Sequence, residues 1–234
     1  MSILIKQRPE RTPADDEAGP RRRDPEATRA AILDAAEELF VDFGPNSTSL
    51  SQLARRAGVT KSLIHHHFGS KEELFAEVQQ RHFRLYFEVQ KQMIAESPSD
   101  ARLLENSLVA YFRFLQDNPK SVRFFSWSLV AGDVCAAEPE KELFELGIRK
   151  IREAQEAGEI RDDLEPFFII KMMIALPMSW FQTKQETLSL IDSEIEPREL
   201  DSLYLADAVR VFVDGLRPAA QRSIERRPVA AASA

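Results

Sequence analysis

The sequence predicts an all-α protein, and three observations carry this prediction. Apolar residues recur at intervals of three and four from about residue 24 onward, which is the spacing of one helix face. Residues that start or stop helices separate these periodic segments. No segment shows a convincing alternation of apolar and polar residues, as a half-buried strand would. Helices packed on helices are therefore the simplest architecture.

The first predicted helix begins at Asp24-Pro25, because Asp is a good N-cap and Pro is favoured at the first helical position. Apolar residues follow at helical spacing over residues 32–43. Gly44-Pro45 is then expected to stop the helix, since glycine favours a left-handed end and proline cannot continue the hydrogen bonding.

Two short helices are predicted next. Ser49 and Gln52 have the spacing of a capping box, in which each side chain bonds the backbone of the other residue. Gly58 is suited to a left-handed backbone and ends this helix after about two turns. Thr60 can cap the following helix, which covers Lys61–Phe68 and is closed by Gly69.

The rest of the chain keeps a helical rhythm. Ser70 and Glu73 form a second capping box, which predicts a long helix from about residue 71 to residue 96. Further helices are predicted over 100–117, 120–131, 139–157, 165–188 and 197–216. The polar residues 1–23 are expected to form a flexible arm, and residues 218–234 a flexible tail.

Charge is unevenly distributed along the chain, whose net charge is −7. Residues 43–71 contain no Asp or Glu, but they contain Arg55, Arg56, Lys61 and Lys71. Residues 72–234 contain 20 Lys and Arg residues against 28 Asp and Glu residues, a net of −8. The acidic part disfavours phosphate contact, so a polyanion is expected to meet the cationic segment.

The two short helices have the layout of a helix-turn-helix, whose second helix enters the major groove of DNA. Around this second helix, Ile64 and Phe68 share one side and are expected to pack inward. Ser62 and His66 then point most directly outward. The candidates for contact with bases or phosphates are Lys61, Ser62, Leu63, His65, His66, His67 and Lys71, with Ser49 before the first short helix as a further candidate.

Residues 29–75, RAAILDAAEELFVDFGPNSTSLSQLARRAGVTKSLIHHHFGSKEELF, resemble the DNA-binding domain of the TetR family of transcriptional regulators. By this resemblance the DNA-contact positions are Thr60, Lys61, Ser62, Leu63, His65, His66, His67 and Lys71. Two of them depart from the family pattern, which usually has Tyr at the position of His65 and often Thr at that of Leu63.

The resemblance implies an N-terminal three-helix helix-turn-helix DNA-binding domain over 24–70 and a larger helical effector-binding and dimerisation domain over 71–217. It also implies a homodimer joined through the last two long helices, about 165–188 and 197–216. Twofold symmetry predicts a palindromic operator. The implied function is that of a repressor released from the operator by a small molecule.

Apolar effectors bind pockets lined by apolar and aromatic side chains. The candidates for such a pocket are Phe124, Trp127, Met173, Pro177, Trp180 and Phe181. Each of these residues could equally belong to an ordinary core or to the dimer interface. An apolar or aromatic effector is therefore one of two interpretations of this set.

Other classes of function receive little support. The chain has no nucleophile motif, P-loop or dinucleotide fingerprint, so neither an enzyme nor a cofactor is expected. Consecutive histidines point in different directions on a helix, so no metal site is expected at residues 65–67. A single cysteine, with no export signal or membrane span, favours the cytoplasm. The alternatives are a DNA-binding regulator or architectural protein without a small-molecule ligand, and a helical enzyme or partner-binding module.

Overall fold

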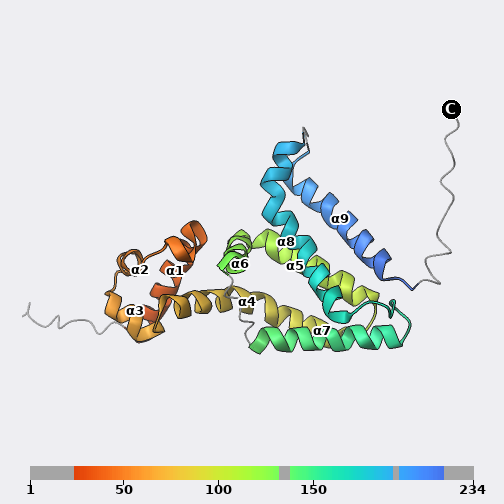
Figure 1. Ribbon diagram of the computed structural model, residues 1–234, viewed down its shortest axis with the longest axis horizontal. Coiled ribbons are helices and arrows are strands. Elements are labelled where there is room, and N and C mark those ends of the chain that lie inside the picture. The colour runs from red at the N-terminus through yellow and green to blue at the C-terminus, as the bar shows by residue number, and fades with distance from the viewer. Residues whose placement is uncertain (1–23, 132–137, 192–194, 219–234) are drawn as a thin grey trace, which may run out of the picture.

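A computed structural model describes residues 24–131, 138–191 and 195–218 (Figure 1). These residues form nine α-helices and no strand, which confirms the predicted all-α fold. The helices are α1 Pro25–Ser47, α2 Leu50–Ala57, α3 Lys61–Phe68, α4 Lys71–Glu96, α5 Ala101–Asp117, α6 Pro119–Ala131, α7 Glu138–Glu156, α8 Pro166–Leu190 and α9 Pro197–Leu216. The predicted arm over 1–23 and residues 219–234 of the predicted tail lie outside the described residues.

The caps expected in the N-terminal part are present. Ser49 with Gln52 and Ser70 with Glu73 form complete capping boxes, so α2 and α4 begin where local chemistry places them. Gly58 has a φ of 64° and ends α2 in the left-handed region. The hydrogen bonds of these caps satisfy backbone groups that helix ends otherwise leave without partners.

The end of α1 differs from the prediction. Gly44 breaks the helical geometry with φ 75° and ψ 164°, but Pro45 starts one more turn and the helix ends at Ser47. A Cβ added at Gly44 would lie 3.1 Å from the indole of Trp127 on α6. The position therefore requires glycine both for its backbone angle and for the close approach of α6.

The first hydrophobic core joins α1, α2 and α3. Its fully buried members include Ile32, Phe40, Leu53 and Ile64. It extends beyond the short helices, because Leu74, Phe75 and Val78 of α4 and Phe124 of α6 belong to the same cluster. Helices α1, α2 and α3 are thus packed onto α4 and α6 by shared apolar side chains.

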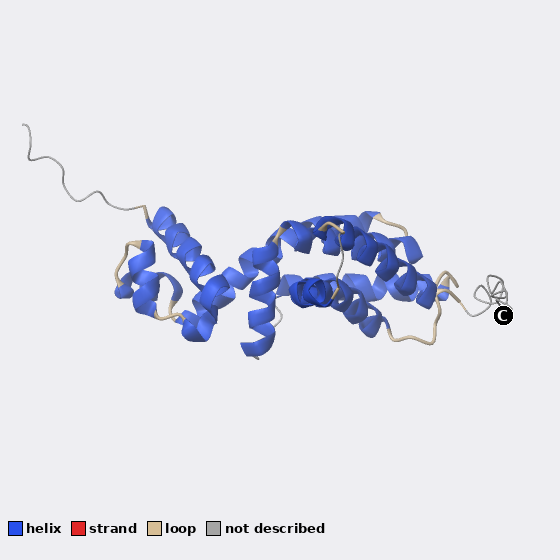
Figure 2. Cartoon of the chain, turned by 90° about the horizontal axis from the view of Figure 1, so that it is seen from above, coloured by secondary structure: helices blue, strands red, loops and turns tan. Residues whose placement is uncertain are grey.

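The remaining helices form the larger part of an elongated molecule. Helix α4 runs from the helix-turn-helix into this part, as Figure 1 and the view from above in Figure 2 show. A second core joins α5, α7, α8 and α9 around Leu108, Ile151 and Ile169, and a third gathers Tyr111, Leu115 and Phe125. Within the described ranges, no helix is long and apolar enough to span a bilayer.

Candidate functional site

The helix-turn-helix has a compact turn between α2 and α3. The amide of Val59 donates to the carbonyl of Ala54 over 3.0 Å, and the amide of Gly58 donates to that of Arg55 over 3.4 Å. The Thr60 hydroxyl then accepts the amide of Leu63 over 3.3 Å and caps α3. These bonds hold the start of α3 close to the end of α2, as the predicted helix-turn-helix requires.

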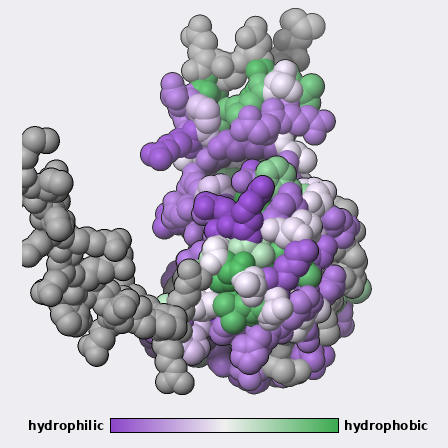
Figure 3. Space-filling model, turned by 90° about the vertical axis from the view of Figure 1, so that its left-hand side faces the viewer, coloured by the Kyte–Doolittle hydropathy of each residue, from purple (hydrophilic) through white to green (hydrophobic). Residues whose placement is uncertain are grey.

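One face of α3 is anchored and the other is exposed. Ile64 and Phe68 are buried, as predicted. The guanidinium of Arg29 lies over the ring of Phe68, 4.9 Å from its centre, in a cation–π contact. Ser62 and His66 are exposed on the far side of the helix. The end of the molecule that bears α2 and α3 faces the viewer in Figure 3, and its surface is mainly hydrophilic with a smaller hydrophobic area.

The three consecutive histidines have different surroundings. Nδ1 of His65 lies 2.6 Å from the carbonyl oxygen of Gly69, so one of its ring nitrogens already has a backbone partner. His67 is half-buried, and its ring lies 6.3 Å from that of Phe68. His66 is exposed and packs edge-on against His67 at 5.4 Å. His66 is therefore the histidine best placed to reach a base edge.

Besides His65, three of the predicted DNA-contact residues have polar side-chain atoms that bond the protein itself: Ser49, Thr60 and Lys71. The Ser49 hydroxyl caps α2, the Thr60 hydroxyl caps α3, and Leu63 is only half-exposed. Lys71 extends to the end of α1, where its Nζ donates to the carbonyl oxygens of Pro45 at 2.9 Å and Thr48 at 3.3 Å.

Lys61 and Ser62, by contrast, make no side-chain hydrogen bond to another residue in the ranges that the structure describes, and both are exposed. Lys61 thus presents a cation and Ser62 a hydroxyl to solvent. Arg56 is paired with Glu38 of α1, which reduces its availability to phosphate.

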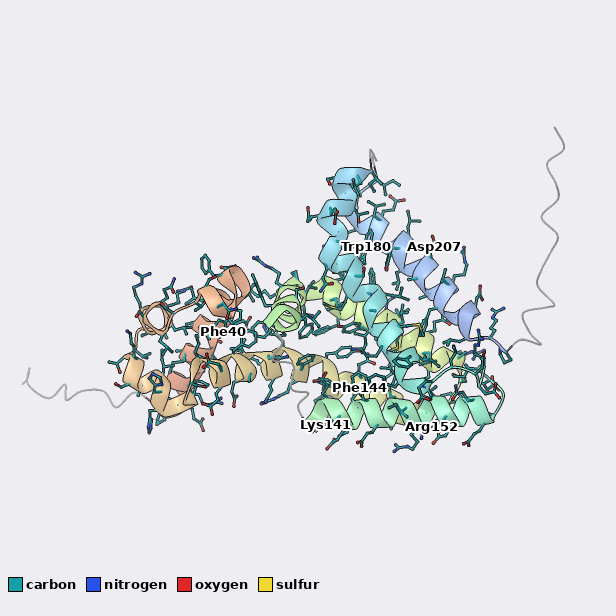
Figure 4. The ribbon with its side chains drawn as sticks, viewed as in Figure 1. Phe40, Lys141, Phe144, Arg152, Trp180 and Asp207 are labelled. Carbon is teal, nitrogen blue, oxygen red and sulfur yellow. The ribbon has the colours of Figure 1, made fainter. Side chains whose placement is uncertain are left out.

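A cavity of about 200 Å³ lies among α4, α5, α6, α7 and α8. Its wall is mostly apolar and includes six aromatic side chains: Phe83, Tyr86, Phe87, Tyr111, Phe125 and Phe144. Figure 4 labels Phe144 on α7, the helix that closes one side of this space. The cavity has the mainly apolar, concave character of small-molecule sites.

Of the six residues predicted for an effector pocket, Met173 lines this cavity and the other five are not among its lining residues. Phe124 belongs instead to the joint with the helix-turn-helix, where its ring stacks on Phe75 at 4.7 Å and on His82 at 5.1 Å. Trp127 lies at the same joint, against Gly44.

The other three residues, Pro177, Trp180 and Phe181, lie further along α8 and pack into the protein. Trp180 is buried, donates from Nε1 to Asp201 over 2.8 Å and stacks on Tyr204 at 4.4 Å. Phe181 contacts the ring of Phe112 at 4.8 Å, and Pro177 is buried within the helix. The side chains of Trp180 and Phe181 are therefore packed against α9 and α5 and do not line the cavity.

Comparison with known proteins identifies the family to which this architecture belongs. Residues 32–78 match the family model of bacterial regulatory proteins of the tetR family, and residues 105–210 match the Tetracyclin repressor-like C-terminal domain. The chain belongs to the TetR family. It is a transcriptional regulator of the helix-turn-helix type.

Two relatives of this TetR-family regulator illustrate the range of control within the family. The transcriptional activator FasR of Mycolicibacterium smegmatis is 30% identical over 123 residues, which cover 53% of this chain and 56% of FasR. The match thus spans little more than half the length of that relative. The transcriptional repressor SCO4008 of Streptomyces coelicolor is 28% identical over 160 residues, 66% of this chain and 78% of the repressor.

Solved structures share the fold of this TetR-family regulator. The transcriptional regulator SCO4942 from Streptomyces coelicolor aligns with a TM-score of 0.61 at 21% identity, over 79% of this chain and 96% of that one. FadR from Bacillus subtilis, solved in complex with stearoyl-CoA, aligns with a TM-score of 0.59 at 17% identity, over 80% of this chain and 99% of FadR. At these identities the likeness establishes the fold.

The cavity residues that sequence reasoning missed include a regular pattern on α4. Phe83, Tyr86, Phe87 and Gln90 follow one another at spacings of three, one and three, so they share a face of the TetR-family regulator's longest helix. A glutamine within an aromatic stripe is the signal that could have indicated a ligand-facing surface.

A buried histidine lies at the joint between the DNA-binding helices and the rest of this TetR-family protein. Nδ1 of His82 is 2.9 Å from the Ser121 hydroxyl on α6, and Nε2 is 3.9 Å from the Glu37 carboxylate on α1. Burial lowers the pKa of His82 from its ordinary value of 6.5; Glu37 opposes this shift, while Arg81 and Lys120 add to it. The buried imidazole is thus kept mainly neutral at neutral pH.

This lowered pKa makes the stability of the TetR-family regulator depend on pH. Below about pH 6.5 the unfolded chain binds a proton at residue 82 that the native state resists, so the free energy of unfolding falls as pH decreases toward the folded pKa. Urea unfolding between pH 7.5 and 5.5 should show a smaller loss for His82→Gln than for the wild type. The control, His66→Gln at an exposed histidine, should keep the wild-type dependence; equal slopes for all three proteins would contradict the assignment.

Proposed function

We propose that the chain is a homodimeric regulator that binds a palindromic operator through α3 and leaves it when a small apolar molecule occupies the cavity. In this proposal residues 24–70 bind DNA, and residues 71–217 bind the effector and form the dimer. The observation that carries it is the path of α4. Only two residues separate the end of α3 from the start of this helix, which further along its length supplies Phe83, Tyr86 and Gln90 to the cavity wall.

The exposed polar face of α3 supports the DNA-binding part of the proposal. We assign base contacts to Ser62 and His66 and a phosphate contact to Lys61, because these side chains are exposed on the outer surface. Leu63, His65 and His67 would complete the contact surface. Ser49, Thr60 and Lys71 would act mainly by holding the helix ends in position, since their polar atoms bond the protein backbone.

Helices α8 and α9 are the proposed dimer interface. Exposed large apolar side chains on these helices include Phe168, Met172, Leu203 and Val211. Figure 3 also shows hydrophobic side chains at the upper end of the molecule, over the ends of α8 and α9. A second copy would remove this apolar surface from water.

The main alternative is a DNA-binding regulator without a small-molecule ligand. The cavity favours the effector-dependent function, because packed protein interiors contain few voids larger than a water molecule. The proposed direction of control is repression: the bound protein would block its promoter, and binding of the ligand would free the promoter. One relative is a repressor and another an activator, so the direction of control is measured separately, as transcription of a reporter under the bound promoter with and without the protein; less transcription with the protein is expected.

Fluorescence anisotropy with DNA from around the chain's own coding region tests the proposal. Tight binding that weakens as salt increases is expected. Lys61→Ala should weaken binding to all sequences and reduce the salt dependence, whereas His66→Ala should cost about 1–3 kcal/mol and relax base preference. The matched control is Lys91→Ala on α4, an exposed lysine distant from α3 in sequence, which should bind like the wild type. Equal weak binding by all four proteins to every fragment would overturn the DNA-recognition assignment.

A further inference from the structure

Gln90 is an unusual residue in the cavity wall. It lies on α4 with only 2% of its surface exposed, and its Oε1 is a buried oxygen with no hydrogen-bond partner among the described residues. A buried polar atom without a partner is costly and is rare in folded proteins. The carboxamide therefore points to a group that joins it from outside the chain.

The surroundings of Gln90 are largely aromatic. The rings of Phe83 and Phe125 stack at 4.5 Å, and those of Tyr86 and Tyr111 meet at 4.9 Å. All four line the cavity with Gln90. Flat walls of this kind favour a planar ring, which can stack or meet them edge-on.

Charge and size restrict the ligand further. The only charged residues in the described lining are Glu140 and Lys171; Lys171 is exposed and Glu140 is half-buried. A charge carried into the aromatic interior would lose its hydration without a buried counter-ion. An engineered cavity of about 150 Å³ accommodates benzene. The present volume of about 200 Å³ thus suits one ring with a small substituent.

We propose that the cavity binds a small, uncharged aromatic molecule with a hydroxyl group, whose ring lies among Phe83, Tyr86 and Phe125 and whose hydroxyl bonds the Gln90 carboxamide. A hydroxyl fits because it both donates and accepts, so it satisfies the carboxamide in either orientation of its oxygen and nitrogen. The proposal rests on the proposed effector function and specifies the chemistry of the same site.

Three probes that share the ethylbenzene skeleton test the proposal: 4-ethylphenol carries a hydroxyl, ethylbenzene has no polar group, and 4-ethylbenzoate carries a negative charge. Titration calorimetry with the full chain should give an affinity for 4-ethylphenol about tenfold higher than for ethylbenzene, the difference expected for one buried hydrogen bond. Binding of 4-ethylbenzoate should be the weakest of the three. Equal affinities for the three probes, tightest binding of the carboxylate, or no binding of any probe would overturn the proposal.

The variant Gln90→Leu should lose the preference for 4-ethylphenol and still bind ethylbenzene, which also shows that the cavity has folded. The matched control is Gln92→Leu, an exposed glutamine on the same helix that bonds Glu96, and it should keep the tenfold preference. If Gln90→Leu keeps the preference for 4-ethylphenol over ethylbenzene, Gln90 does not bind the ligand hydroxyl and the proposal is wrong.

Anisotropy with bound operator DNA separates this proposal from the proposed function. If 4-ethylphenol binds with the expected preference but leaves DNA affinity unchanged, the ligand chemistry stands and release by the effector fails. If the protein binds operator DNA and no probe enters the cavity, DNA recognition stands and the ligand chemistry fails.

Discussion

Replacing Phe124 by alanine is expected to lower the free energy of unfolding by about 4 kcal/mol, the typical cost of removing a buried phenyl ring. The ring is fully buried, and it stacks on Phe75 of α4 and on His82. It comes from α6 but belongs to the core of the DNA-binding helices. Its removal would leave a cavity where α4 and α6 meet that core.

Urea unfolding followed by circular dichroism measures this effect. The control is Phe43→Ala, which removes the same side chain from an exposed position on α1 and should change the free energy of unfolding by less than about 1 kcal/mol. Phe124→Leu keeps an apolar side chain and should cost less than Phe124→Ala while remaining folded. Equal losses for Phe124→Ala and Phe43→Ala would show that the α6 joint contributes little.

The second large effect is expected at Asp201, a buried carboxylate on α9. It accepts hydrogen bonds from Gln116 at 2.9 Å and Trp180 at 2.8 Å, and Lys184 lies at 2.7 Å. Asp201→Ala would leave these donors without their partner and the lysine without its counter-ion. We expect a loss of about 3 kcal/mol in the free energy of unfolding.

The pH dependence of this loss has a definite sign. Burial alone would raise the pKa of Asp201, but hydrogen bonds from Lys184, Gln116 and Trp180 outweigh it and hold the pKa below its ordinary value of 3.8. The stabilisation is therefore complete above that value and is lost as pH falls through the lower, folded pKa.

Unfolding curves should thus show a constant difference between wild type and Asp201→Ala from pH 7 to pH 5, and a narrowing difference below about pH 4. Asp207→Ala is the matched control on the same helix (Figure 4), since its carboxylate is exposed and lies 3.5 Å from Arg210. A small effect of Asp201→Ala at neutral pH would contradict a central role for this carboxylate.

Local chemistry explains why so much of the N-terminal part could be predicted. Capping at Ser49, Thr60 and Ser70 depends on residues only three positions away, and the left-handed turn at Gly58 depends on one residue. The inner face of α3 follows from helical geometry alone. The extra turn after Gly44 was missed because proline, which cannot continue a helix, is also favoured at the first position of a new helical turn.

The candidate ligand site was less predictable, because an apolar face does not specify which element covers it. Phe124 and Trp180 are residue types that often line apolar pockets. In the structure, however, Phe124 is covered by the core of the DNA-binding helices and Trp180 is covered by α9. Both outcomes depend on contacts between distant segments. The sequence shows Gln90 as a glutamine within an aromatic stripe, but the lack of a partner for its oxygen follows only from the packing of the surrounding helices.

The continuity of α4 has a mechanical consequence. From Lys71 to Gln90 the helix rises about 28 Å, so a tilt of about 5° at the cavity would displace its first turn by about 2.5 Å. Under the proposed function α4 would act as a lever, because a small shift of a cavity side chain on ligand binding would become a larger displacement at the other end of the helix. In a symmetric dimer two such arms would add their displacements, and recognition helices spaced for half-sites about 34 Å apart would lose their register with the groove.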